Sequence, residues 1–308
     1  MMNDQELIKQ MSIDTGLLPE HLRLIIKTAP LRYKVFTIPK KNGKTREIAQ
    51  PAREVKLIQR WLIQKLTPLL PVHKVTTAYK AHSSIKKNAQ PHAENNFLLK
   101  IDFKDFFPSI EIKDIIQHLT IHCGDDYDDL AIRLIARCLC WAPNRKPPLR
   151  LCIGAPSSPL MSNSILHDFD SILFDLTDKK GITYTRYADD ISISSSKRGE
   201  LDEMLAFIKS AILKINYPTI KINPKKTVFA SRKGRRFVTG IVLTSEKKLS
   251  VGRERKKLIR SMYHHFRCNK LDDKQQAHLK GLLSFVESIE PGFTERLRSS
   301  YESKGVTN

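Results

Sequence analysis

The chain has 308 residues, of which 53 are Lys or Arg and 32 are Asp or Glu, so its formal net charge is +21. Hydrophobic residues make up 41% of the chain, enough for a buried core, which excludes a protein that is disordered along most of its length. The length corresponds to about two domains or one large divided fold. The positive charge is compatible with a nucleic acid partner, an anionic membrane surface or simply a basic protein.

Three features bear on the compartment. No apolar run approaches the ~18 residues of a membrane span, and the polar N-terminal segment MMNDQELIKQ lacks the pattern of a secretory signal. The five cysteines show no CxxC spacing, which argues against a disulfide framework or a zinc site. We therefore expect a cytoplasmic protein with reduced thiols and no membrane association.

Helices and strands alternate along the chain. Short apolar runs predict strands at residues 96–103, 182–186 and 191–195, and a strand pair element at residues 237–243. Helical spacing of apolar residues predicts helices at residues 55–69, 158–176, 201–215 and 253–267. Ser158 and Pro159 have the residue types of an N-cap and a first helical position, and residues 142–150 are predicted to form a loop. This order indicates an α+β fold.

Positive charge is concentrated near the C-terminal end. Residues 224–270 hold 15 Lys or Arg and only two acids, Glu246 and Glu254, a net of +13 out of +21. Because this density of like charge repels itself, it favours a surface that binds phosphates over a solvated basic face. Within it, the helix at residues 253–267 has a predicted core face made of Leu258, Ile259, Met262, Tyr263 and Phe266.

Acidic residues stand at two points where their carboxylates are held by apolar strands. Asp189 and Asp190 lie in a tight turn between strands, and Asp102 ends the strand at residues 96–103. Fixed acids repel each other unless a cation lies between them, and burying an unpaired carboxylate is costly. A third carboxylate that met the turn would complete an oxygen site suited to Mg²⁺. Three carboxylates that hold two Mg²⁺ ions, with Mn²⁺ as a substitute, suit nucleotidyl transfer to a hydroxyl.

Four segments, in this order, resemble the catalytic motifs of reverse transcriptases. They are FLLKIDFKDFFPSI (97–110), IGAPSSPLMSN (153–163), YADD (187–190) and INPKKT (222–227). The resemblance implies a right-hand polymerase fold with N-terminal helices and fingers (1–95), an antiparallel-sheet palm with the catalytic Asp residues (96–245) and a helical, RNA-binding thumb (246–308). It also implies RNA-directed DNA synthesis from dNTPs.

Two short segments resemble the bacterial retron type of that family: NAQPH, which runs from Asn88 to His92, and VTG at 238–240. That resemblance implies a structured non-coding RNA as partner and priming from a guanosine 2′-hydroxyl. The product would be branched multicopy single-stranded DNA (msDNA), with a role in antiphage defence and an effector protein encoded nearby. Ile153 departs from the family, which usually has Gln before Gly154, so the nucleotide and template contacts made there are left open.

The motifs also imply roles for single residues. Asp102, Asp189 and Asp190 would hold the metal ions together with the backbone carbonyl of Phe103, and Lys226 would protonate the departing pyrophosphate. The ring of Phe107 would exclude a ribose 2′-hydroxyl. The candidates for nucleotide binding are Arg46, Lys44, Phe107, Gly154 and Ala155. The candidates for contact with RNA or primer are Asn88, His92, Thr239, Gly240, Arg253, Arg255, Lys256, Lys257 and Arg260.

Two other functions stay open at this point. One is a non-catalytic RNA-binding scaffold or antitoxin component, although a scaffold has no need of three mutually repelling carboxylates. The other is a different bacterial reverse transcriptase, either diversity-generating or intron-derived. The sequence does not indicate the cognate RNA, the priming guanosine, the point where synthesis stops, the effector or the oligomeric state.

Overall fold

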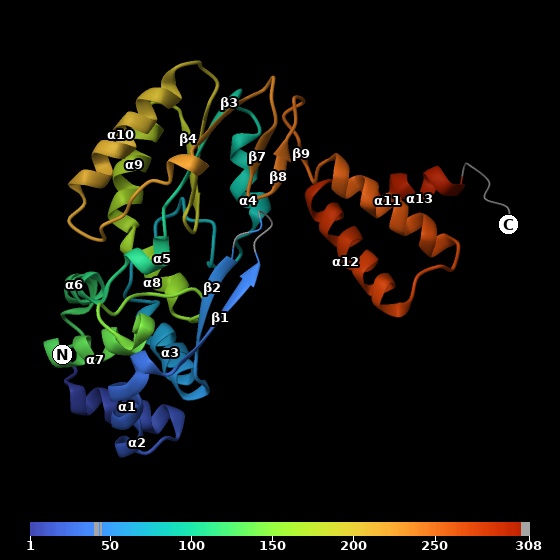
Figure 1. Ribbon diagram of the computed structural model, residues 1–308. Helices are drawn as coiled ribbons and strands as arrows, with labels where there is room; N and C mark the ends of the chain where they lie inside the picture. Colours follow the sequence, from blue (N-terminus) through green and yellow to red (C-terminus); the bar gives the residue numbers. More distant parts are fainter. Residues whose placement is uncertain (40–42, 44, 303–308) are drawn as a thin grey trace.

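The computed structural model describes residues 1–39, 43 and 45–302. At its centre is an antiparallel four-stranded sheet with the order β4-β5-β3-β6 (Figure 1). The strands are β3 (Phe97–Asp102), β4 (Thr183–Tyr187), β5 (Asp190–Ser195) and β6 (Val228–Ser231). The strands predicted at 96–103, 182–186 and 191–195 are thereby confirmed.

The sheet is covered on both faces because the side chains of β3 alternate between two cores. Leu99 and Ile101 lie in the larger core, which also contains apolar residues of α10 (Glu200–Lys214) and α9 (His167–Lys179). Leu98 lies in a second core with Ala89, from α4 (Ile85–Ala89). Figure 1 shows α9 and α10 on one side of the sheet and α4 on the other.

The N-terminal part is helical and carries a projecting hairpin. Its hairpin pairs β1 (Tyr33–Pro39) with β2 (Thr45–Pro51), and most of its side chains are exposed. The helix α3 confirms the prediction for residues 55–69 and ends before Pro68. The helices of this part and of the segment that follows β3 are α1 (Asp4–Thr15), α2 (Pro19–Thr28), α3 (Arg53–Leu66), α5 (Phe106–Ser109), α6 (Ile112–Cys123) and α7 (Asp129–Leu139).

The C-terminal part has its own small sheet and shares the second core with α4 and β3. Its strands, in the order β7-β8-β9, are β7 (Arg236–Val238), β8 (Ile241–Leu243) and β9 (Leu249–Ser250). Three helices follow: α11 (Arg253–Arg267), α12 (Asp273–Ile289) and α13 (Phe293–Glu302). Ile259 and Tyr263 of α11 are buried against the other two helices in the second core. Figure 1 shows this helical group beyond β9, apart from the central sheet.

Three sequence predictions are corrected and a further one is confirmed. Residues 158–176 form two helices, α8 (Ser158–Ile165) and α9, with Ser157 rather than Ser158 at the N-cap. The guanidinium of Arg186 donates to the Asn163 carbonyl at this break (3.3 Å), which satisfies one acceptor at the end of α8. The strand pair predicted at residues 237–243 is confirmed, because β7 and β8 form a hairpin there. On α11, Leu258 and Phe266 are exposed, at 48% and 42%, because the core is filled from a narrower stripe.

Candidate active site

The three predicted carboxylates come together at one end of the central sheet. Asp102, the last residue of β3, lies directly opposite Asp190, the first residue of β5. Tyr187 at the end of β4 pairs with Asp190, so Ala188 and Asp189 form a two-residue turn between β4 and β5. Cα atoms of directly paired residues in antiparallel strands are about 4.5–5.5 Å apart. Strand pairing therefore brings together acids that are far apart in the chain.

The carboxylates of Asp189 and Asp190 are largely buried and lie among other negative charges. Burial, followed by the charges of Asp190 and Asp102, raises the pKa of Asp189 to about 6. Burial also raises the pKa of Asp190, although the positive charge of Lys100 opposes the rise. These shifts show that the turn holds its carboxylates close enough to repel each other, which favours binding of a cation.

Lys226 already supplies one positive charge. It ends the short helical turn η4 (Pro224–Lys226), and its Nζ donates to Asp102 Oδ2 at 2.7 Å. Burial alone would lower the pKa of Lys226, but the hydrogen bond and charge of Asp102 outweigh that effect and raise it. Asn223 fixes this segment against β3, since its N–H donates to the Asp102 carbonyl at 2.8 Å. Lys226 is therefore charged and seated at the acids.

The donors fit a hard divalent cation in their chemistry. Carboxylate and carbonyl oxygens are the ligands of such ions. The bridge between Phe103 and Ile222 is made by hydrogen bonds of the neighbouring residues, which do not use the Phe103 carbonyl. Within residues 1–39, 43 and 45–302, however, no three His, Cys, Asp or Glu side chains are already gathered into a finished metal site. Asp102 Oδ2 accepts from Lys226 instead, so a metal ion bound by that oxygen would compete with the lysine for its charge.

The predicted nucleotide contacts on the hairpin are only partly described. Arg46 is exposed on β2, and Lys44 lies outside the described residues. Sequence reasoning missed Tyr79, whose phenol is influenced by a charge of the catalytic turn and by one of the hairpin. Burial and then Asp189 raise the pKa of its phenol, while Arg46 lowers it, so both charges lie near the ring. Tyr79 has a left-handed backbone, with φ 57°, a conformation that its residue type does not predict.

Phe107 lies at the edge of the aromatic part of the core. Its ring is half-buried in α5, with its centroid 5.5 Å from that of Phe106, which packs in turn on Phe103. The preceding Asp105 adopts φ 48°, which turns the chain sharply after β3. The ring is thereby held five residues beyond Asp102, where the predicted contact with the sugar stays a prediction.

Gly154 and Ala155 pack closely against the hairpin. The N–H of Ala49 on β2 donates to the Ile153 carbonyl at 2.9 Å. A Cβ atom on Gly154 would lie 2.8 Å from the Ala49 carbonyl oxygen, and its φ of +120° also requires glycine. Ala155 is buried beside Ala49 and Trp141. The small residues are thus explained by contact with β2, and contact with a nucleotide stays a prediction.

Asn88 and His92 do not face RNA in this fold, which corrects the prediction of direct contact. Both are fully buried, at 0% exposure. Asn88 Oδ1 accepts from Thr77 Oγ1 at 2.8 Å, and the two ring nitrogens of His92 lie 2.7 and 2.8 Å from hydroxyls of β5 and β4. Burial lowers the pKa of His92 to about 3, so the ring is neutral. His92 thus holds the residues after α4 against the central sheet, and Asn88 ties α4 to the segment of Thr77.

Thr239 and Gly240 form the two-residue turn between β7 and β8. Both have positive φ, 46° and 82°, as expected of a tight hairpin turn that matches the strand twist. Asn88 Nδ2 donates to Thr239 Oγ1 at 3.4 Å, which joins the turn to α4. Contact of this turn with a primer stays a prediction.

The predicted cations of α11 are not equivalent. Arg253, Lys257 and Arg260 are exposed, whereas Lys256 forms a 2.5 Å ion pair with Glu290 and Arg255 stacks over the ring of Phe285. Lys256 is therefore used within the helical group, and the exposed cations are the ones available to a phosphate backbone.

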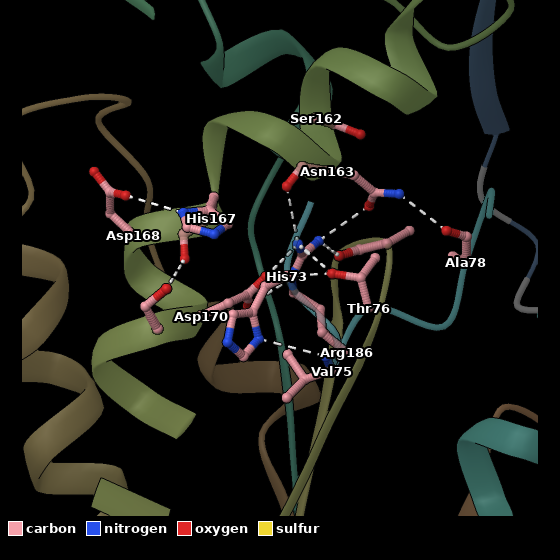
Figure 2. Close-up of polar contacts among 12 residues, drawn as sticks. His73, Val75, Thr76, Ala78, Ser162, Asn163, His167, Asp168, Asp170 and Arg186 are labelled. Atoms are coloured by element: carbon pink, nitrogen blue, oxygen red, sulfur yellow. Dashed lines mark hydrogen bonds and ion pairs between the residues drawn. The ribbon is translucent and has the colours of Figure 1, made fainter. Parts of the chain in front are cut away.

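Sequence reasoning also missed a buried network beneath the turn. Arg186 on β4 and Asp170 on α9 form an ion pair with both side chains at 0% exposure (Figure 2). The same guanidinium donates to the Ala188 carbonyl, next to Asp189, at 2.9 Å. A charged residue within a strand gives no sign in the sequence of the partner that neutralises it.

The sheet, the exposed hairpin, the terminal helices and the convergent acids define a right-hand polymerase. The family model for reverse transcriptase (RNA-dependent DNA polymerase) matches residues 38–276. Retron Ec83 reverse transcriptase of Escherichia coli is 36% identical over 281 residues, which cover 90% of both chains. Retron Ec86 reverse transcriptase of the same organism is 34% identical over 292 residues, covering 94% of this chain and 87% of the relative. The chain belongs to the reverse transcriptase family, in its retron type, and is an RNA-directed DNA polymerase.

Solved structures agree on the fold. The telomerase of Candida albicans in complex with a TWJ fragment of telomeric RNA matches with a TM-score of 0.51 at 13% identity. The telomerase of Candida tropicalis with the same kind of fragment gives 0.51 at 11% identity. These matches cover 86% and 88% of this chain but 55% of each telomerase chain. Among the helices that the structure describes, none is both long and apolar enough to cross a membrane.

Proposed function

We propose that the chain is the polymerase of a retron, which copies a structured non-coding RNA into DNA from a guanosine 2′-hydroxyl in that RNA. The product would be branched msDNA. The proposal is supported by the relatives, which are named retron reverse transcriptases, and by one structural observation that carries the catalytic part. That observation is the strand register that sets Asp102 opposite Asp190, with Asp189 beside them.

In this proposal Asp102, Asp189 and Asp190 hold Mg²⁺, with Mn²⁺ as a substitute, and the Phe103 carbonyl is a further ligand. Bound metal ions would supply activation of the attacking hydroxyl and neutralise charge on the triphosphate. The raised pKa of Asp189 supports this reading, because carboxylates that repel each other gain most from a shared cation.

Lys226 would donate a proton to the departing pyrophosphate. Its ammonium is charged and donates to Asp102 in this structure. We propose that it turns to the phosphates when Asp102 binds a metal ion. Replacing Lys226 by Leu should slow single-turnover extension on the order of 100-fold. Its neighbour Lys225 in the same helical turn is the matched control. An equal rate for Lys226→Leu and Lys225→Leu would reject the assignment.

The remaining roles follow the same division of the molecule into fingers (1–95), palm (96–245) and thumb (246–308). In the fingers, Arg46 would grip the triphosphate, which the shared influence of Arg46 and Asp189 on Tyr79 supports. In the thumb, exposed cations of α11 would follow the RNA backbone, which the exposure of Arg253, Lys257 and Arg260 supports. A cytoplasmic location, an effector protein encoded nearby and a role in antiphage defence complete the proposal.

The experiment is to express the chain from its own locus, purify it and sequence the RNA and DNA that accompany it, before and after cleavage of 2′,5′ branches. The wild type should carry one RNA species joined to one DNA species. The Asp189→Asn variant should carry the RNA alone. Many unlinked RNAs would instead indicate another reverse transcriptase type, and RNA without DNA in both samples would indicate a scaffold.

A further inference from the structure

We propose that Arg186 is a positioning residue for the catalytic turn: its buried pair with Asp170 fixes the peptide between Ala188 and Asp189 and so aims the Asp189 carboxylate at Asp102 and Asp190. The inference rests on the proposed function, because it assigns Arg186 to a carboxylate taken as catalytic.

The ion pair is built with little freedom. Arg186 Nε lies 2.9 and 3.0 Å from the two carboxylate oxygens of Asp170, and Nη2 lies 2.6 Å from Oδ2. Tyr184, on the same strand as Arg186, donates its hydroxyl to Asp170 Oδ1 at 2.6 Å. Because both charges are withdrawn from water, loss of either partner would leave the other uncompensated. The guanidinium plane is therefore fixed relative to β4 and α9.

That fixed plane reaches the turn. Arg186 Nη1 donates to the Ala188 carbonyl at 2.9 Å, and Ala188 has φ 57°, a left-handed conformation that is unfavourable for alanine. The carbonyl of Ala188 and the N–H of Asp189 belong to one planar peptide unit. Fixing the carbonyl therefore also fixes the direction of the N–Cα bond of Asp189, from which its side chain projects. Holding one side of the peptide thus orients the acid on the other.

The guanidinium also ties the turn to two neighbouring segments. Its nitrogens lie 3.1 Å from Thr76 Oγ1 and 3.3 Å from Asn163 Oδ1, and Asn163 Nδ2 donates to the Ala78 carbonyl at 2.9 Å. Figure 2 shows these contacts converging on Arg186 from β4, from α8 and α9, and from the segment before Tyr79. All five N–H donors of the side chain are in use. A lysine, with three donors on one atom, cannot reproduce this set.

If the ion pair were merely structural, disturbing it would lower stability without affecting catalysis. A substitution at Tyr184 separates this case from a positioning role. Tyr184→Phe removes a buried hydrogen bond to Asp170 but leaves the contact from Arg186 to Ala188 intact. Arg186→Lys keeps the charge but loses that contact. The two variants therefore differ in whether the turn is held, while both disturb the same buried carboxylate.

The test compares wild type, Arg186→Lys, Tyr184→Phe and Asp189→Asn by circular dichroism, by kcat and KM for dNTP, and by equilibrium binding of Mn²⁺ alone followed by electron paramagnetic resonance. We expect Arg186→Lys to lower kcat on the order of 100-fold with KM nearly unchanged, and to weaken Mn²⁺ binding. Tyr184→Phe should melt at a lower temperature with kcat and Mn²⁺ binding near wild type.

A folded Arg186→Lys variant with wild-type kcat and Mn²⁺ binding would overturn the inference, as would equal kcat losses in Arg186→Lys and Tyr184→Phe. If Arg186→Lys does not fold, Asp170→Asn takes its place. It keeps the size of the side chain but removes the charge that fixes the guanidinium, so it should lower kcat, and a folded Asp170→Asn variant with wild-type kcat would overturn the inference. Failure of the proposed function is recognised separately, by an Asp189→Asn variant that still polymerises at the wild-type rate.

Discussion

Replacing Asp189 by Asn is expected to stabilise the metal-free protein while it abolishes DNA synthesis. Burial and the neighbouring acids raise the pKa of Asp189 from 3.8 to about 6. Since one pKa unit is worth about 1.4 kcal/mol, ionising Asp189 in the folded state costs at most about 3 kcal/mol. The folded protein binds more protons than the unfolded chain between these two pKa values. Its stability therefore falls as the pH rises through this interval and stays lowered above it.

The assay is thermal unfolding with a chelator present, at about pH 7.5 and about pH 5. An unfolding entropy of about 2.1 cal/mol/K per residue over 308 residues converts ~3 kcal/mol into a rise in Tm of at most about 5 °C. The gain should be about halved at pH 5, where Asp189 is mostly protonated when folded. Added Mg²⁺ should stabilise the wild type more than the variant.

The control for this experiment is Asp105→Asn, the same chemical change in the same motif. Asp105 is exposed, and its φ of 48° suits Asn as well as Asp. Its Tm should match the wild type at both pH values. A Tm for Asp189→Asn at or below that of the wild type at pH 7.5 without divalent ions would refute the reasoning. So would a gain that does not shrink at pH 5.

Three other substitutions test separate parts of the molecule. Phe107→Ala should raise incorporation of ribonucleotides relative to deoxyribonucleotides by about 10- to 200-fold in single-insertion kcat/KM, and an unchanged ratio would reject the steric role. Gly154→Ala should cost about 1–3 kcal/mol in denaturant unfolding, because its Cβ would lie 2.8 Å from the Ala49 carbonyl oxygen at a φ of +120°; a wild-type midpoint would contradict this. Replacing Arg253 and Lys257 by Gln should reduce the salt dependence of RNA binding by a slope of about 2, and an unaltered slope would exclude them from phosphate contact.

The sequence predicts the central strands well because apolar runs and period-2 patterns reflect burial directly. It also predicts that Asp102 meets the turn at Asp189 and Asp190, since all three acids end or join buried strands. The break between α8 and α9 could not be predicted, because the apolar stripe continues across Leu166. The structure interrupts the helix where Arg186, from a distant strand, donates to a carbonyl of α8.

Polar residues mark the limit of sequence reasoning. Asn88 and His92 are in the NAQPH segment, and the resemblance to the retron type implied contact with RNA. In the structure they are buried and hydrogen-bonded inside the protein, because a polar side chain can find its hydrogen-bond partners on segments other than its own. The partnership of Arg186 with Asp170 is hidden for the same reason. Each residue alone reads as an exposed charge, and only the fold pairs them.

The most direct measurement is extension of a DNA primer on an RNA template by the purified protein with dNTPs and Mg²⁺, with Asp189→Asn and Asp105→Asn in parallel. Templated DNA should appear with wild type and Asp105→Asn, stop when the divalent ion is chelated, and be absent with Asp189→Asn. DNA made equally well by Asp189→Asn would contradict the assignment of the three acids as the catalytic centre.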